Sequence, residues 1–470
     1  MAVKPYSPIT DALFGRLPVN FYMAKDQEFG TIMHGTPGLA TFCALPNCTE
    51  VRGLWTWDNY LYAVARRGGD SVLFRISPTG VSSELGFFST SFTGPVWMLN
   101  NYKQLLIVDG VSGYVYTQAT GGFAQITNPD FPGAAAATYQ DTYGLLVQPN
   151  SIYWFFSTPL DFTAYDSLNS YAKEGWTDKI QGILSNQLQI MIGGVETTEI
   201  WQDVGGDNTS AQTPTFQRVP GGLYKYGWAS PSAACVCDNT GIWVTDQGQV
   251  LRLLGYSPSI ISTDMTGRLL AGFSSITDVI TFTMIDQEHT FFIATFPGGG
   301  RTIVYDTKME AWHERSSYLD DGSGYGRWRV NCCARFNNGN YGGDYSNGLI
   351  YQIDPKAYDD NGNEIQGILT ALEVHAGEQA INWRQIQVVA KTGVGTVSGA
   401  GTNPYAALDY SEDGGFTFST PRPRSMGQIG ATYTRLRWLR NGQSRRRMWR
   451  LTITAPVERQ ILGVDWGGPK

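Results

Sequence analysis

The sequence has little of what a metal site, a redox site or a membrane span requires. It contains only four histidines, too scattered to indicate a metal or a catalytic triad. Its six cysteines form close pairs without a Cys-x-x-Cys set, so we expect reduced, buried thiols and no zinc. No run of about 18 apolar residues is present, so we expect no membrane insertion. The opening "MAVKPYSPITDALFGRLPVNFY" has no signal-peptide pattern. We predict that the chain uses no metal and no other cofactor.

Long stretches of helix-forming residues are also missing. Charged residues make up only 16% of the chain, whereas aromatic residues make up 13% and glycines number 55 of 470. Aromatic and β-branched residues favour strands, and glycine favours the turns between them. The composition therefore predicts an all-β protein with many turns.

Short turn-and-strand units recur along the middle of the chain. The segments "VDGVSGYVYTQ" (108–118) and "GDYSNGLIYQI" (343–353) share an Asp, a Gly and a Tyr at matching positions. Seven such units occur, with steps of 42, 38, 47, 50, 54 and 46 residues between equivalent positions. These positions are Phe74, Tyr116, Trp154, Trp201, Leu251, Tyr305 and Tyr351. A period of about 40–50 residues is typical of a β-propeller.

The repeat divides the chain into three predicted parts. Residues 49–366 are predicted to form a β-propeller of about seven blades, and six or eight blades also fit the pattern. A large β-sandwich with irregular hairpins is the alternative. Longer alternating strands predict a C-terminal β-sandwich over residues 367–470. Residues 1–48 lack the blade pattern, so we expect an extended arm that packs on the C-terminal domain.

The segment "SEDGGFT" matches the Asp-box pattern of sialidases and related propellers. Its defining residues are Ser411, Asp413, Gly415 and Thr417. In such a turn the Asp accepts backbone N–H groups and the Gly adopts a left-handed conformation. Sialidase chemistry would also require three converging arginines and an activated tyrosine, and the spacing singles out no such set. We therefore predict a structural turn and no catalytic residues.

Positive charge is concentrated near the end of the chain. Residues 421–470 contain 11 Lys and Arg against two acidic residues, a net charge of +9. Because the whole chain carries −7, residues 1–420 sum to −16. This asymmetry indicates an interaction region, although a solvated arginine edge is the alternative.

Most of this charge lies in "LRWLRNGQSRRRMWRLT" (436–452). Asn441-Gly442 is a strong hairpin signal, and a two-residue loop would place Arg437 opposite Arg446. The alternation then predicts an apolar inward face of Leu436, Trp438, Trp449, Leu451 and Ile453. The other face would carry Arg435, Arg437, Arg446 and Arg450. Because like charges opposite one another cost stability, we predict that these four bind an anion. Carboxylates of a partner protein are preferred, and DNA phosphates are the alternative.

Several segments resemble the packaged-DNA stabilisation proteins, or tail hub and nozzle proteins, of short-tailed phages (podoviruses). They are "RLPVNFY…GTPGLATF", "GGVETTEIW", "TIVYDTKMEAWH" and, most specifically, "DYSEDGGFTFS…MGQIGATYTRLRWLRNGQSRRRMWRLTITAPVERQILG". The resemblance runs along the whole chain. It implies a non-enzymatic virion protein of the phage tail, made in the host cytoplasm.

The same resemblance implies partners. Copies are expected to form a ring, expected to be a hexamer, below the portal and its adaptor proteins. The ring would extend and close the DNA channel, retain the packaged DNA that passes through it, and anchor tail needle and tailspike or fibre proteins. The four arginines would face the adaptor or a neighbouring subunit.

A carbohydrate-binding or sialidase-like propeller that acts on host glycans is the alternative function. Tryptophans stack well on sugars, but in propellers they often pack between blades. The candidates are Trp55, Trp57, Trp176, Trp228 and Trp328.

Overall fold

The computed structural model describes residues 15–90, 92–206, 208, 213–375, 377 and 379–467. Within these ranges the regular secondary structure is almost wholly β-strand, with a single α-helix, α1 (Asp264–Ala271). The described residues divide into two compact units. The larger unit comprises residues 41–300 and 329–352, and the smaller unit contains residues 301–328 and the described residues before 41 and after 352.

Strands recur in the same order from residue 50 to residue 354. In chain order the first strands of the seven repeats are β4 (Glu50–Trp57), β8 (Trp97–Asn100), β12 (Ala136–Gln140), β16 (Ile180–Asn186), β20 (Ala234–Cys237), β24 (Ile280–Asp286) and β29 (Val330–Phe336). The second strands are β5 (Tyr60–Arg67), β9 (Gln104–Val108), β13 (Tyr143–Val147), β17 (Gln189–Gly194), β21 (Thr240–Val244), β25 (His289–Phe296) and β30 (Gly339–Asp344). The third are β6 (Asp70–Ile76), β10 (Gly113–Thr117), β14 (Tyr153–Thr158), β18 (Thr198–Asp203), β22 (Val250–Leu254), β26 (Arg301–Asp306) and β31 (Leu349–Asp354). Fourth strands follow in every repeat: β7 (Ser82–Ser89), β11 (Gly122–Gln125), β15 (Asp161–Ala172), β19 (Phe216–Tyr224), β23 (Ser257–Ile260), β27 (Ala311–Tyr318) and, in the seventh repeat, β3 (Gly38–Ala44) from the N-terminal segment.

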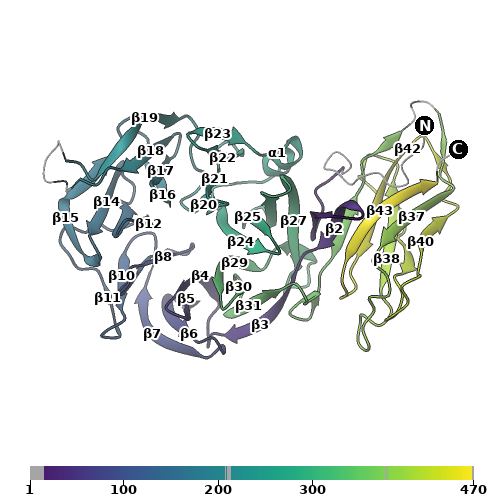
Figure 1. The fold of residues 1–470 in the computed structure, drawn as a ribbon, viewed down its shortest axis with the longest axis horizontal. Coiled ribbons are helices and arrows are strands. Elements are labelled where there is room, and N and C mark those ends of the chain that lie inside the picture. Colours follow the sequence, from purple (N-terminus) through teal and green to yellow (C-terminus); the bar gives the residue numbers. More distant parts are fainter. Residues whose placement is uncertain are drawn as a thin grey trace. The chain divides into compact units, whose positions relative to one another are not determined.

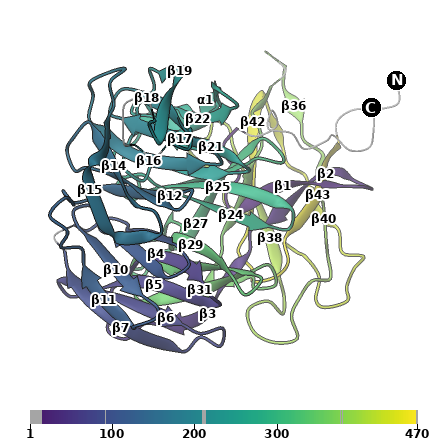
Figure 2. The same ribbon diagram turned by 60° about the vertical axis from the view of Figure 1, so that its left-hand side comes forward.

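The first strands of the larger unit form a closed circle. Each of β4, β8, β12, β16, β20, β24 and β29 contacts the next, and β29 contacts β4. Figure 1 shows these strands around a common centre, and Figure 2 shows the outermost strands, such as β7, β11 and β15, from the side. A circle of radially arranged antiparallel sheets is a β-propeller, which confirms the predicted fold class.

The sequence repeat corresponds to one strand position. All seven equivalent residues lie in the third strand of their repeat, from Phe74 in β6 to Tyr351 in β31, and all are buried. Aromatic rings join neighbouring blades at these positions, as in the contact between Tyr62 and Tyr116, whose ring centroids are 6.1 Å apart. The period was therefore visible because each blade buries a large side chain against its neighbour.

Tight hairpins connect the first two strands of several blades. Asp58 and Asn59 have φ values of 47° and 58°, and Asn337 and Asn338 have 44° and 61°, as a two-residue type I′ turn requires. The turn that follows Asn100 is longer. There Oδ1 of Asn101 accepts hydrogen bonds from the backbone N–H groups of Lys103, which precedes β9, and of Gln104, its first residue.

The smaller unit contains a two-sheet β-sandwich. One sheet has the order β1 (Phe21–Asp26), β2 (Gly30–Gly35), β43 (Gln460–Gly467), β37 (Gln385–Ala390) and β40 (Leu436–Leu439). The other has the order β34 (Gly367–Thr370), β42 (Arg446–Ile453), β38 (Tyr405–Ser411) and β39 (Arg422–Ser425), and β35 (Val374–His375) also pairs with β42. A short ladder joins β36 (Ile381–Asn382) to β41 (Gln443–Ser444). The remaining strands are β28 (Tyr325–Arg327), which pairs with β27, and the short hairpin of β32 (Asp359–Asp360) and β33 (Asn363–Glu364).

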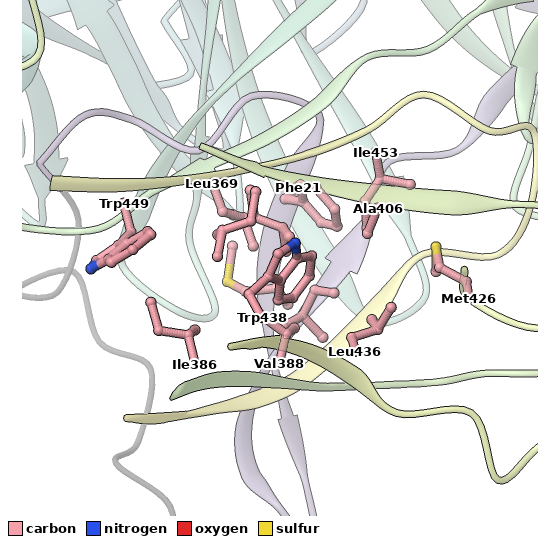
Figure 3. Close-up of a cluster of buried hydrophobic side chains, with 14 of the residues drawn as sticks. Phe21, Leu369, Ile386, Val388, Ala406, Met426, Leu436, Trp438, Trp449 and Ile453 are labelled. Carbon is pink, nitrogen blue, oxygen red and sulfur yellow. The ribbon is translucent and has the colours of Figure 1, made fainter. Parts of the chain in front are cut away.

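Apolar side chains from both sheets fill the space between them. Figure 3 shows Trp438 near the centre of this cluster, with Trp449 at one end and Met426 at the other. Trp438 is fully buried, and its Nε1 donates a hydrogen bond of 2.7 Å to the carbonyl oxygen of Arg422. A buried indole therefore both fills the core and satisfies its polar atom.

The N-terminal segment contributes strands to the sandwich. The sequence predicts an extended arm over residues 1–48, but the described part contains the β1–β2 hairpin, in which Tyr22 lies opposite His34. Strand β2 pairs with β43, with Met33 opposite Ile461. The sheet that contains β1, β2 and β43 thus combines residues from near both ends of the sequence.

Candidate partner surface

The arginine-rich segment is divided between the two sheets of the sandwich. Strand β40 pairs with β37, which places Arg437 opposite Gln387. Strand β42 pairs with β38 and places Arg450 opposite Asp409. The predicted hairpin, in which Arg437 lies opposite Arg446, is therefore wrong.

The connection at Asn441 explains the difference. A type I′ turn needs positive φ at both central residues, but of Asn441 and Gly442 only Gly442, at 77°, has it. Asn441 is buried, its N–H donates to the Trp383 carbonyl, and its Nδ2 donates to the Trp438 carbonyl at 2.9 Å. A hydrogen bond to Trp383, which is distant in the sequence, thus holds Asn441 where the chain passes from one sheet to the other.

The predicted alternation holds despite the wrong pairing. Leu436 and Trp438 of β40 point inward from one sheet, and the inward residues of β42 point toward them from the other (Figure 3). All five residues of the predicted apolar face are buried: Leu436, Trp438, Trp449, Leu451 and Ile453. Arg437 therefore points outward from one sheet and Arg446 and Arg450 from the other, while Arg435 precedes β40, so the structure does not bring the four predicted arginines together.

The arginines of β42 are neutralised within the fold. The Arg450 guanidinium donates to both carboxylate oxygens of Asp409, at 3.0 and 2.5 Å, and lies 3.7 Å from the Phe418 ring centroid. Arg446 forms an ion pair with Glu373 at 3.4 Å. These ion pairs neutralise, within the chain, the positive charge that the sequence predicts for binding a partner.

Arg447, which lies between Arg446 and Arg450 on β42, is buried. Its guanidinium donates to the Glu412 carboxylate and to the Asn441 carbonyl, and it lies 3.8 Å from the Tyr410 ring centroid. Sequence reasoning missed this residue because it shares the inward side of the strand with Trp449. The three carboxylates were missed as well, since they lie 35 to 73 residues before their partners in the sequence.

The arginines around β40 have a different environment. Arg435 is exposed, Arg437 donates to the Gln385 side chain at 2.8 Å, and Arg424 of the neighbouring β39 donates to the Arg437 carbonyl at 2.9 Å. Arg440 is exposed after the end of the strand. Within the described residues, none of these arginines forms an ion pair with a carboxylate. We name Arg424, Arg435, Arg437 and Arg440 the basic edge.

A shallow groove adjoins the basic edge. Its volume is about 650 Å³, and Arg424 is one of its lining residues. Tyr405, Ala407, Pro421 and Pro423 are among its apolar lining residues. Positive charge and apolar surface thus lie side by side along β39.

The Asp-box residues form one compact turn at the end of β38. The Asp413 carboxylate accepts the backbone N–H groups of Phe416 and Thr417 at 3.0 Å and the Thr417 hydroxyl at 2.6 Å. Ser411 Oγ donates to Asp413 at 2.6 Å and accepts the Gly415 N–H at 2.8 Å. The hydrogen bonds from Ser411 and Thr417 hold the pKa of Asp413 well below its usual range.

Gly415 has a φ of 91°, a conformation that side chains other than glycine rarely adopt. Its carbonyl accepts a 2.6 Å hydrogen bond from Arg16. The turn also contains Glu412, the partner of Arg447. The arrangement orders the loop beside β42.

The tryptophans considered for glycan binding have mixed environments. Trp57, Trp228 and Trp328 are buried, while Trp55 is 36% and Trp176 43% exposed. Trp228 packs directly on Gly193, where a Cβ atom would lie only 2.0 Å from the indole. At least three of the five are therefore packing residues.

Thiols and carboxylates in the described part of the chain form no metal-binding group of three or more. None of the six cysteines, all of which lie in the described residues, forms a disulfide, and burial raises the pKa of Cys235 to about 11. In the acidic turn at 358–364, Asp360 accepts a 2.6 Å hydrogen bond from Ser317.

Among the residues described, no helix is both long and apolar enough to cross a membrane.

Comparison with solved structures gives distant matches. A catalytically inactive virginiamycin B lyase from Staphylococcus aureus is 10% identical, with a TM-score of 0.44, covering 67% of this chain and 98% of its own. The N-terminal domain of Nup159 is 8% identical, with a TM-score of 0.42 and coverages of 72% and 98%. The extracellular domain of BT4673 from B. thetaiotaomicron is 9% identical, with a TM-score of 0.45 and coverages of 75% and 42%. The comparison with curated proteins gives no match.

Two family models match the sequence in succession. The model described as bacteriophage P22 Gp10, beta-propeller, matches residues 12–358. The model described as bacteriophage P22 Gp10, beta-sandwich, matches residues 368–465. Together they span the propeller, the sandwich and the arginine-rich segment. The chain therefore belongs to the bacteriophage P22 Gp10 family, the packaged-DNA stabilisation proteins of short phage tails.

Proposed function

We propose that the chain is a subunit of a ring, with six copies expected, that lies below the portal and adaptor of a short-tailed phage. The ring extends the DNA channel, retains the packaged genome and anchors the needle and the tailspike or fibre proteins. Its role is architectural and requires no catalytic step. The observation that carries the proposal is the succession of two matching family models along one chain.

The physical character of the chain agrees with this role. A closed propeller protects its strand edges and presents many loops on a stiff body, which suits a protein that several partners contact. The charge of −16 over residues 1–420 opposes the binding of DNA phosphates to most of the chain. A channel that conducts DNA during ejection benefits from weak adhesion to it.

DNA-filled particles that lack this protein provide the test. They should release their genome, and purified protein added beforehand should bind the particles and keep the DNA inaccessible to nuclease. The measurement is the nuclease-resistant DNA per particle with and without added protein. Equal retention in both samples would contradict the proposed role.

A further inference from the structure

The basic edge presents positive charge that the fold leaves uncompensated. On β40, Arg437 and Leu439 point away from the core, and Leu439 is 51% exposed. Arg435, also exposed, directly precedes the strand and lies two residues before Arg437 in the chain. Strand β37 places Gln387 opposite Arg437, and Gln385 accepts a hydrogen bond from Arg437, so neither of these neighbours is a carboxylate. Their charge is therefore available to an anion outside this chain.

The edge is unsuited to strand addition. Pro421 and Pro423 have no N–H groups to donate, and the side chains of Arg424 and Trp438 donate to backbone carbonyls of β40 and β39. A partner is thus contacted through side chains. Guanidinium groups favour bidentate pairing with carboxylates, and the adjoining apolar groove adds area to the contact.

The larger unit of the same protein has the complementary charge. Residues 41–300 and 329–352 contain 22 acidic and 13 basic residues, a net charge of −9. Residues 367–470 contain 13 basic and seven acidic residues, a net charge of +6. Copies placed head to tail would therefore bring opposite charges together.

One acidic pair of the propeller stands out. Asp141 lies in the turn between β12 and β13, and Asp203 lies at the end of β18. Burial and the nearby Asp141 carboxylate raise the pKa of Asp203. Neither residue forms an ion pair within the part of the chain that the structure describes. Two adjacent carboxylates without a cation match two adjacent guanidinium groups without an anion.

We infer that the basic edge of one copy docks on the propeller of a second copy, with Arg435 and Arg437 opposite Asp141 and Asp203. This inference rests on the proposed ring. A contact between two different surfaces of identical subunits is head to tail, and it closes into a ring when the rotation between copies permits. Binding of the basic edge to the adaptor or to DNA is the alternative, and the experiment distinguishes it from docking on a second copy.

The test is a charge swap in the full chain. The proteins to compare are wild type, Arg435→Glu/Arg437→Glu, Asp141→Arg/Asp203→Arg, and the chain that carries all four changes. Lys25→Glu is the control for reversing the charge of an exposed basic residue elsewhere, because Lys25 lies on β1, the edge of the same sheet opposite β40. Attachment of each protein to DNA-filled, tailless particles is measured by sedimentation, and thermal unfolding checks that each is folded.

Each double variant should attach on the order of 30-fold more weakly than wild type, and the four-change chain should recover most of the loss. Lys25→Glu should attach normally. Normal attachment of the arginine double variant, or a folded four-change chain that stays unattached, would overturn the inference, and the latter result points to the adaptor or DNA. If wild type itself fails to attach, the proposed function fails first and the inference with it.

Discussion

Strands β40 and β42 come from one arginine-rich segment and differ in how the fold treats their charge. In β42, Arg446, Arg447 and Arg450 each meet a carboxylate from a neighbouring loop or strand. On β40, Arg437 meets a glutamine amide, and exposed Arg435 has no carboxylate partner among the described residues. The same residue type thus stabilises the fold on one strand and remains available for binding on the other.

The position of each strand in its sheet accounts for the difference. β42 lies between β34 and β38, so acidic residues on both sides can reach its arginines. β40 is an edge strand with a single pairing neighbour, β37. Charge on an edge strand also discourages unwanted sheet-to-sheet association. An arginine count alone therefore does not identify a binding surface, because the count ignores what lies across the strand.

The largest effect is expected where the two strands face each other in the core. Trp438→Ala removes a fully buried indole and should lower the free energy of unfolding by about 3–5 kcal/mol. Tyr433→Ala, at a side chain that is 97% exposed, should change it by less than about 0.5 kcal/mol. Denaturant unfolding of the full chain measures both. Similar losses would mean that Trp438 is not central to the sandwich.

A smaller effect is expected at the buried arginine of β42. Arg447→Met keeps the apolar stem but leaves Glu412 and the Asn441 carbonyl without their donor. Because Glu412 is half-exposed and can regain water, we expect a loss of about 2 kcal/mol, at the low end for a broken buried pair. Arg435→Met is the control and should leave the unfolding midpoint unchanged. A neutral Arg447→Met would show that the pair is dispensable.

The smallest stability effect is expected at the exposed pair. Arg446 and Glu373 lie 3.4 Å apart with side chains 55% and 26% exposed, so Arg446→Gln should cost less than about 1 kcal/mol. Raising the salt concentration should remove most of that difference. Thermal unfolding at low and high salt measures it, and a large loss that salt does not change would indicate an additional role for Arg446.

The sequence predicted the features that depend on local periodicity. Alternation identified the buried sides of β40 and β42, since every second residue of a strand faces the same way. The recurrence of Phe74 to Tyr351 identified the propeller because each blade repeats one packing position. Strand pairing was predicted wrongly because Asn441-Gly442 is a local signal, whereas Asn441 is held by Trp383, far away in the sequence. The partners of the arginines were missed for the same reason.

Paired measurements of attachment and stability test the central claim most directly. Arg435→Gln/Arg437→Gln removes two charges from the basic edge, and Arg446→Gln/Arg450→Gln removes two from β42. The first variant should keep the wild-type unfolding midpoint and lose attachment to DNA-filled, tailless particles. The second should unfold at lower denaturant, because the buried Asp409 carboxylate loses its partner, yet attach normally when folded. The account would be contradicted if the first variant lost stability and the second lost attachment, or if the first variant attached normally.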